Sequence, residues 1–331
     1  MATLAQQPIS LRSDDSGCGD TEIAYLIEEV RAGRLDALRD YLSRTRASGD
    51  WQDRIHVLER VAPNVSIDAL HAACGAEPDA ADLLVTRCAY YVDLAKTMRG
   101  SGTADQVSGA RFQNAGACVK AAMNDMSRST QLDDRDPTAY TLVLKPLTIF
   151  GQIELQQKAF AQAAAIAPDL VPAHFALISA SSKRWGGSHA DSLSFANWAM
   201  SKAAPGSDMA ACLFWAHTLV RTHFLHFDKD WQSANRYALK PEVTGELNAA
   251  LDAWLAPPYV LRRSSIPFLH KASEWYRAVK DVDRLNRVVA LTGEPLNLVP
   301  DTGAGMRQTN GFSKSSSKGG GGLLGWILGG K

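Results

Sequence analysis

The chain has 331 residues, of which 46% are hydrophobic and 21% are charged, a composition typical of a globular protein with a substantial core. Its 35 Lys and Arg residues balance its 35 Asp and Glu residues. This balance argues against nucleic acid as a partner, because the chain has no general positive field.

The cysteines and the N-terminus indicate in which cellular compartment the protein is expected. The five cysteines are scattered and none belongs to a C-x-x-C pair, which favours reduced thiols over a disulfide framework. Residues 1–20 are a polar lead-in that lacks the basic start and apolar run of a secretory signal. No stretch approaches the ~20 apolar residues that span a bilayer. We therefore expect a cytoplasmic protein.

Helical periodicity begins directly after this lead-in. Asp20 or Thr21 is suited to cap a first helix, and a break at Gly33 separates its apolar face from that of a second helix. Further helical patterns cover 51–61, 66–74 and 79–98, and alternating β-branched runs are nearly absent. Residues 21–135 are therefore predicted to form an N-terminal helical region.

The region 136–295 carries a spacing signal. Pro137, Pro168, Pro205 and Pro241 each break helical stretches, at intervals of 31, 37 and 36 residues. A two-helix repeat needs roughly 34 residues. An Ala-rich helix, a proline break and a new helix follow in that order at 168 and again at 205. This pattern predicts antiparallel helix hairpins stacked on one another, with a capping helix that ends near Gly293.

Three segments carry a family resemblance: Arg-Trp-Gly-Gly-Ser at 184–188, Ser-Phe-Ala at 194–196 and Ala-Pro-Gly-Ser at 204–207. With them, residues 136–255 resemble a degenerate tetratricopeptide-repeat array, as found in a bacterial family of unknown function. No unit keeps the full repeat pattern. The resemblance implies an all-α fold, a TPR-like α-solenoid, and contacts with other proteins. It supplies no catalytic residues.

The loop at 184–188 is a candidate partner-binding site. Its two glycines permit unusual backbone angles, and Ser188 can cap the next helix. Exposed Arg184 and Trp185 would be suited to binding, since Trp and Arg are common in binding hot spots. The alternative is an ordinary turn with Trp185 packed beneath it.

The histidines raise an alternative function. His223 and His226 are three residues apart, so they share a helix face, and Asp230 follows one turn later; zinc can use such a set. His217 lies on a different side, and no H-E-x-x-H signature exists. A helical metal-dependent enzyme therefore stands as the alternative, while the main expectation is no enzyme and no cofactor.

The tail at 296–331 changes in character. It is rich in Gly, Ser and Lys, a composition expected to be flexible. It ends in five large apolar residues: Leu323, Leu324, Trp326, Ile327 and Leu328. These would dock on a partner, fold back onto the chain, or touch a membrane with the help of Lys314, Lys318 and Lys331.

The leading hypothesis is a protein-interaction scaffold that captures a peptide or helix in the groove of a solenoid. Its partner is another protein. A membrane-peripheral adaptor held by the tail remains a further alternative.

Overall fold

The computed structural model describes residues 20–100, 107–204 and 206–292, and in these ranges the chain is all helical, with fifteen α-helices and no strand. The first eight helices are α1 (Thr21–Arg31), α2 (Asp36–Ser48), α3 (Trp51–Val61), α4 (Ile67–Ala76), α5 (Ala81–Arg99), α6 (Gly109–Leu132), α7 (Thr138–Ile149) and α8 (Ile153–Ile166). The remaining seven are α9 (Val171–Ala180), α10 (His189–Ser201), α11 (Ala211–His226), α12 (Trp231–Ala238), α13 (Pro241–Trp254), α14 (Ile266–Val279) and α15 (Val282–Thr292).

Local signals account for several helix boundaries. The side chain of Asp20 accepts hydrogen bonds from the amides of Glu22 and Ile23 at the start of α1, so the predicted N-cap is confirmed. Ser188 caps α10 in the same way, by accepting from the amide of Asp191 at 3.0 Å.

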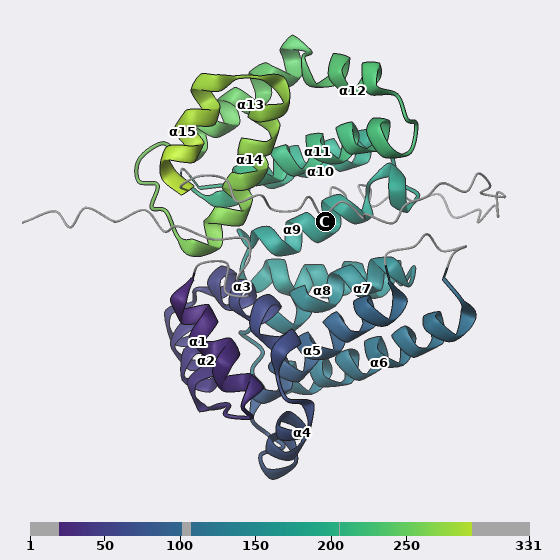
Figure 1. The fold of residues 1–331 in the computed structure, drawn as a ribbon, viewed down its shortest axis with the longest axis vertical. Helices are drawn as coiled ribbons and strands as arrows, with labels where there is room; N and C mark the ends of the chain where they lie inside the picture. The colour runs from purple at the N-terminus through teal and green to yellow at the C-terminus, as the bar shows by residue number, and fades with distance from the viewer. Residues whose placement is uncertain (1–19, 101–106, 205, 293–331) are drawn as a thin grey trace, which may run out of the picture.

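Consecutive helices pair as hairpins, and the hairpins contact one another through their first helices. The pairs are α5–α6, α7–α8, α9–α10, α11–α12 and α14–α15, and contacts run from α5 to α7, α7 to α9, α9 to α11 and α11 to α14. Figure 1 shows this succession from the lower half of the molecule to the upper half. The ends of α5, α7, α9 and α11 that lead toward their partner helices lie on one side, at the right of the view.

One contiguous core joins the two helical regions. It includes buried side chains from α1, such as Ile23, through to α15, where Val288 is buried. The sequence analysis divides the two helical regions between residues 135 and 136. This position lies within the packed core, because α5 and α6 both contact α7.

Buried polar side chains connect distant helices within that core. Arg54 of α3 has no exposed surface, and it donates to the carbonyl of Leu42 at 2.6 Å, to Asp82 at 2.7 Å and to Asp136 at 2.8 Å. It also reaches Thr138 at 3.2 Å. A guanidinium this deeply buried is tolerated only when carboxylates and carbonyls replace its water.

A second buried group lies before α11. Asp208 belongs to a short 3₁₀ turn, 208–210. It accepts hydrogen bonds from Gln52 at 2.6 Å, Trp254 at 2.9 Å and Ser265 at 2.7 Å. This carboxylate therefore ties α3 to α13 and to the segment that precedes α14.

Replacing Arg54 with Met should lower the free energy of unfolding by about 3–5 kcal/mol, because Asp82 and Asp136 lose their shared buried cation. Arg39→Met is the matched control. Arg39 pairs with Glu77 at 2.7 Å, but both side chains are exposed, so its loss should be below about 1 kcal/mol. Chemical denaturation of both variants makes the comparison. Equal losses would show that Arg54 does not hold the helices together.

Candidate functional site

Exposed apolar side chains collect on the side of the molecule where the hairpin turns lie. Six of the eleven large apolar side chains that are exposed in the described ranges occupy this position. They are Met98 at the end of α5, Phe112 at the start of α6, Ile153 and Leu155 at the start of α8, and Phe227 and Trp231 at the α11–α12 turn. We call these six residues, with Arg184 and Trp185, the turn edge.

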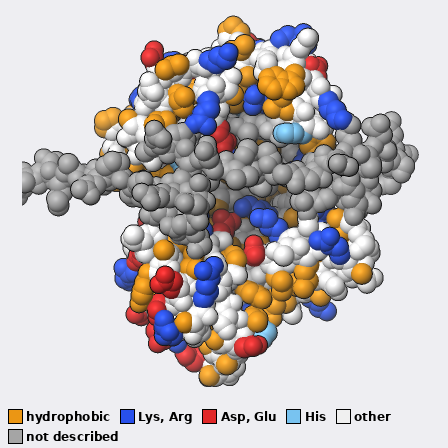
Figure 2. All heavy atoms as spheres, in the orientation of Figure 1, with side chains coloured by type: hydrophobic (Ala, Val, Ile, Leu, Met, Phe, Trp, Pro, Cys, Tyr) orange, Lys and Arg blue, Asp and Glu red, His pale blue; other side chains and the backbone are white. Residues whose placement is uncertain are grey.

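The exposure is large for residues of this kind. Trp231 is 67% exposed and Ile153 is 58% exposed. Single exposed apolar residues are ordinary, but their concentration along one side of a soluble domain marks a surface for interaction. Figure 2 shows hydrophobic side chains gathered at the lower right, over α5 to α8.

Direct contacts link neighbouring turns of the edge in pairs. The Phe112 ring lies 4.6 Å from the Phe150 ring, so the first turn of α6 contacts the α7–α8 turn. The Arg184 guanidinium lies 5.9 Å from the centre of the Phe227 ring, so the α9–α10 turn contacts the end of α11. The edge is therefore built by hairpin stacking.

Arg184 and Trp185, which the sequence predicts as a binding loop, lie in a 3₁₀ turn, 183–185. Arg184 is exposed and Trp185 is partly buried. The guanidinium lies over the Trp185 ring at 5.4 Å as well as over Phe227, a cation–π arrangement that restrains both rings. Gly187 is required in this turn, because a Cβ there would lie 2.0 Å from the carbonyl oxygen of Ser181.

Behind this contact lies a histidine pair that the sequence pattern did not indicate. The His223 ring of α11 stacks on the Phe227 ring at 5.0 Å. The His189 ring of α10 lies 5.1 Å from the His223 ring. Burial, with the nearby Lys183, holds the pKa of both imidazoles below the usual value. Neutral rings of this kind support the packing of α10 on α11.

The metal alternative receives no geometric support. His223 is buried, whereas His226 is exposed, so the two residues do not point to one place. Within the ranges that the structure describes, no group of three or more His, Cys, Asp or Glu side chains is arranged to hold a metal ion. The buried His217 instead contacts Tyr237 at 2.7 Å and Glu246 at 2.8 Å, and both of these partners are partly exposed.

A second surface lies at the other side of the fold. Glu22, Tyr25, Asp40 and Arg44 line a shallow groove of about 640 Å³ between α1 and α2. Tyr25 is half exposed at its rim. The charges of this groove belong to an internal network, and for that reason we favour the turn edge as the site.

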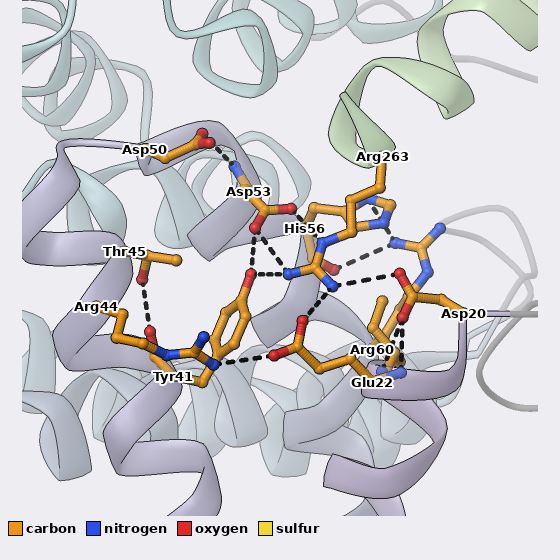
Figure 3. A network of polar contacts seen from close by, with 11 residues as sticks. Asp20, Glu22, Tyr41, Arg44, Thr45, Asp50, Asp53, His56, Arg60 and Arg263 are labelled. Atoms are coloured by element: carbon orange, nitrogen blue, oxygen red, sulfur yellow. Dashed lines mark hydrogen bonds and ion pairs between the residues drawn. The ribbon is translucent and has the colours of Figure 1, made fainter. Parts of the chain in front are cut away.

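Arg263 is the centre of that network (Figure 3). It donates to Asp53 at 2.7 Å and 2.9 Å, to Glu22 at 2.9 Å and to Asp20 at 3.3 Å, and it also contacts the Tyr41 hydroxyl. Burial opposes ionisation of Asp53, but the hydrogen bonds from Arg263 and Tyr41 outweigh it and keep the pKa of Asp53 below the usual value. The network joins α1, α2 and α3 to the segment before α14.

His56 lies beside this network in Figure 3. Burial, together with the Arg60 guanidinium 3.0 Å from its Nδ1 atom, lowers the pKa of His56 to about 3. Burial also lowers the pKa of His174 and His270. The folded chain therefore holds these imidazoles neutral at a pH where an unfolded chain would protonate them.

The apolar end of the tail, Leu323, Leu324, Trp326, Ile327 and Leu328, lies outside the described residues, as does Cys18. The other four cysteines are free and buried: Cys74, Cys88, Cys118 and Cys212. None of the helices in the described ranges combines the length and apolar character needed to cross a bilayer.

Replacing Trp231 or Ile153 with Ser should change the free energy of unfolding by less than about 0.5 kcal/mol, because neither side chain is packed. Trp254→Ala should cost about 3–5 kcal/mol, since Trp254 is 1% exposed. Thermal or urea denaturation distinguishes the two classes. A loss above about 1.5 kcal/mol at Trp231 would mean that the turn edge is structural.

Stability should fall as the pH decreases from 7 to 5. In this window unfolded His56 takes up a proton near its ordinary pKa of about 6.5, while folded His56 does not. His56→Gln should remove about 2 kcal/mol of the loss at pH 5. Leu239→Gln, at an exposed position that carries no titratable group, is the control and should keep the pH dependence of the wild type. Denaturant titration at pH 7 and pH 5 measures the free energy of unfolding. Identical pH dependence in His56→Gln and the wild type would contradict the lowered pKa of His56.

Comparison of the chain with models of known protein families, with curated protein sequences and with solved structures finds no match. The turn edge and the buried networks therefore rest on the geometry of this chain alone.

Proposed function

We propose that this protein is a helical scaffold that binds a segment of another protein along the turn edge. The observation that carries the proposal is the collection of six exposed apolar side chains at the turns of successive hairpins. Surfaces of this kind lose unfavourable contact with water when a partner covers them. Trp and Arg, the residues most common in binding hot spots, are both present, as Trp231, Trp185 and Arg184.

The order of helix contacts supports a repeat-like scaffold. Hairpins that touch through their first helices, as α5, α7, α9 and α11 do, are typical of solenoids, which present extended surfaces to partners. The tetratricopeptide-like arrangement expected from the sequence belongs to this proposal. The sequence hypothesis has the partner in a groove between hairpins, whereas the exposed apolar residues favour the edge formed by their turns.

The chemistry of the edge supports a proposal of binding rather than catalysis. Its prominent side chains are aromatic and aliphatic, and His223 beside them packs on the Phe227 ring. A cytoplasmic location is part of the same proposal. It is supported by the four free buried cysteines, because reduced thiols are usual in that compartment.

Site-specific photo-crosslinking in cells that naturally make the protein tests the proposal. A photoreactive amino acid at position 153 or 231 should give the same discrete adduct, because one partner spans both turns. Positions 25 and 282 are matched controls, since Tyr25 is 52% and Val282 is 60% exposed but neither belongs to the edge. They should give no such adduct.

Two results would contradict the proposal. Adducts of equal yield from all four positions would indicate non-specific collisions. Absence of any adduct from both edge positions would remove the turn edge as a binding surface.

A further inference from the structure

Two imidazoles meet where the α9–α10 turn packs on the end of α11. The His189 ring, at the start of α10, lies 5.1 Å from the His223 ring of α11. The His223 ring also stacks on Phe227, and the Arg184 guanidinium of the α9–α10 turn lies over the same Phe227 ring. This histidine pair therefore lies beside a contact that joins two turns of the edge.

Each ring of the histidine pair has one nitrogen that is buried and unpaired. Within the described residues, His223 Nδ1 and His189 Nε2 are both buried and have no hydrogen-bond partner. A neutral imidazole tolerates this, because one of its two nitrogens carries no hydrogen. A protonated imidazole carries two N–H groups, and burying either of them without an acceptor is unfavourable. The observed packing therefore accommodates the neutral rings but not the protonated ones.

The charges around the pair also oppose protonation. Burial is the largest cause that lowers the pKa of both imidazoles, and the nearby Lys183 lowers them further. Asp228 acts in the opposite direction, from a position 3.5 Å from the Nε2 atom of His223. Asp228 is exposed, so water and salt screen its charge. A charge on His189 would further oppose protonation of His223.

Other charged or titratable groups lie on the same segments and on α12. They are Arg184, Asp191, His226, Lys229, Asp230 and Tyr237. Asp191 accepts a hydrogen bond from Ser188, and Asp230 accepts one from Ser233. These two carboxylates therefore cap the helices α10 and α12, and neither provides an acceptor for the unpaired nitrogens of the histidine pair.

We propose that the histidine pair is a pH-sensitive switch, in which protonation at acidic pH separates the α9–α10 turn from the end of α11 and interrupts the turn edge there. An imidazolium needs water or an acceptor at both nitrogens, and the buried nitrogens reach water only when the two segments separate. Arg184 and Phe227 then lose their contact. The opening stands on the geometry of the pair, whereas its consequence, release of the partner at low pH, rests on the proposed function.

The direction of the switch follows from proton linkage. Imidazoles exposed by the opening have an ordinary pKa of about 6.5, whereas the packed rings bind a proton only at lower pH. The closed arrangement is therefore fully favoured above pH 7 and loses stability as the pH falls through 6.5. Between pH 7.5 and 5.5, each imidazole should raise the ratio of open to closed molecules about ten-fold, and the pair about 100-fold.

Hydrogen–deuterium exchange of the full chain, read by mass spectrometry and corrected for the intrinsic effect of pH, measures the opening. The reporters are the amides of Phe227, Asp228 and Asp230, which donate to the carbonyls of His223 and Phe224 at the end of α11. Their protection should fall at least ten-fold from pH 7.5 to 5.5. The amides of α7, a helix without histidine, should change less than two-fold in the same sample.

Glutamine variants assign the effect to the two rings. His189→Gln and His223→Gln each remove one titrating group, so the pH effect should shrink about ten-fold in each, and the double variant should show none. Leu239→Gln, at an exposed position without a titratable group, should behave as the wild type does. Each variant is compared with itself at the two pH values, so a substitution that loosens the turn at neutral pH does not obscure the result.

The inference is overturned by unchanged protection at the end of α11 in the wild type, by an equal loss in α7, or by a double variant that keeps the full pH effect. Crosslinking at positions 153 and 231 at neutral pH tests the proposed function separately. Adducts without the opening would retain the scaffold and remove the switch. Opening without adducts would retain the switch and remove the binding surface.

Discussion

The burial of Arg54 is the constraint on which the rest of the structure depends. A guanidinium without exposed surface must keep its charge, so the fold has to bring acceptors to it from several directions. Those acceptors come from α2, from α5 and from Asp136 just before α7. Satisfying one side chain therefore positions the N-terminal helices against the first two of the stacked hairpins.

The neighbours of Arg54 extend this constraint to the C-terminal half. Gln52 donates to Asp208, and Asp53 accepts from Arg263. Successive residues of a helix point about 100° apart, so three consecutive side chains of α3 reach three different parts of the chain. Helix α3 thus connects the N-terminal helices, the hairpins and the segment before α14 through side-chain hydrogen bonds.

This central anchoring leaves the opposite ends of the hairpins free for another role. The ends of α5, α7, α9 and α11 that lead toward their partner helices lie on one side of the molecule, and the exposed apolar residues near them contribute nothing to the central networks. The proposed binding function requires this separation, because substitutions in a binding surface should not unfold the protein. The buried imidazoles lower the stability of the fold at low pH, because the unfolded chain can protonate them more readily than the folded chain.

Ion pairs between helices contribute unequally to the fold. Arg263 is largely buried and is paired with carboxylates of α1 and α3, so it helps to hold the fold together. Arg39 and Arg44 of α2 form their pairs at exposed positions, where an ion pair contributes little.

The sequence by itself determined the helical class and many helix ends, because these depend on residues within one or two turns of each other. Asp20 and Ser188 cap helices as their types predict. Pro137 precedes α7, and Pro241 is the first residue of α13, where a missing amide hydrogen does no harm.

Only the tertiary structure decided the networks and the turn edge. The pattern of 51–61 marks Arg54 as one more polar residue of an amphipathic helix, since its partners Asp82 and Asp136 lie 28 and 82 positions away. Likewise Phe227 and Arg184 meet only because two hairpins stack. Hydrophobic periodicity predicts which residues share a helix face. It does not predict which helix faces pack together, because that packing depends on contacts between segments far apart in the chain.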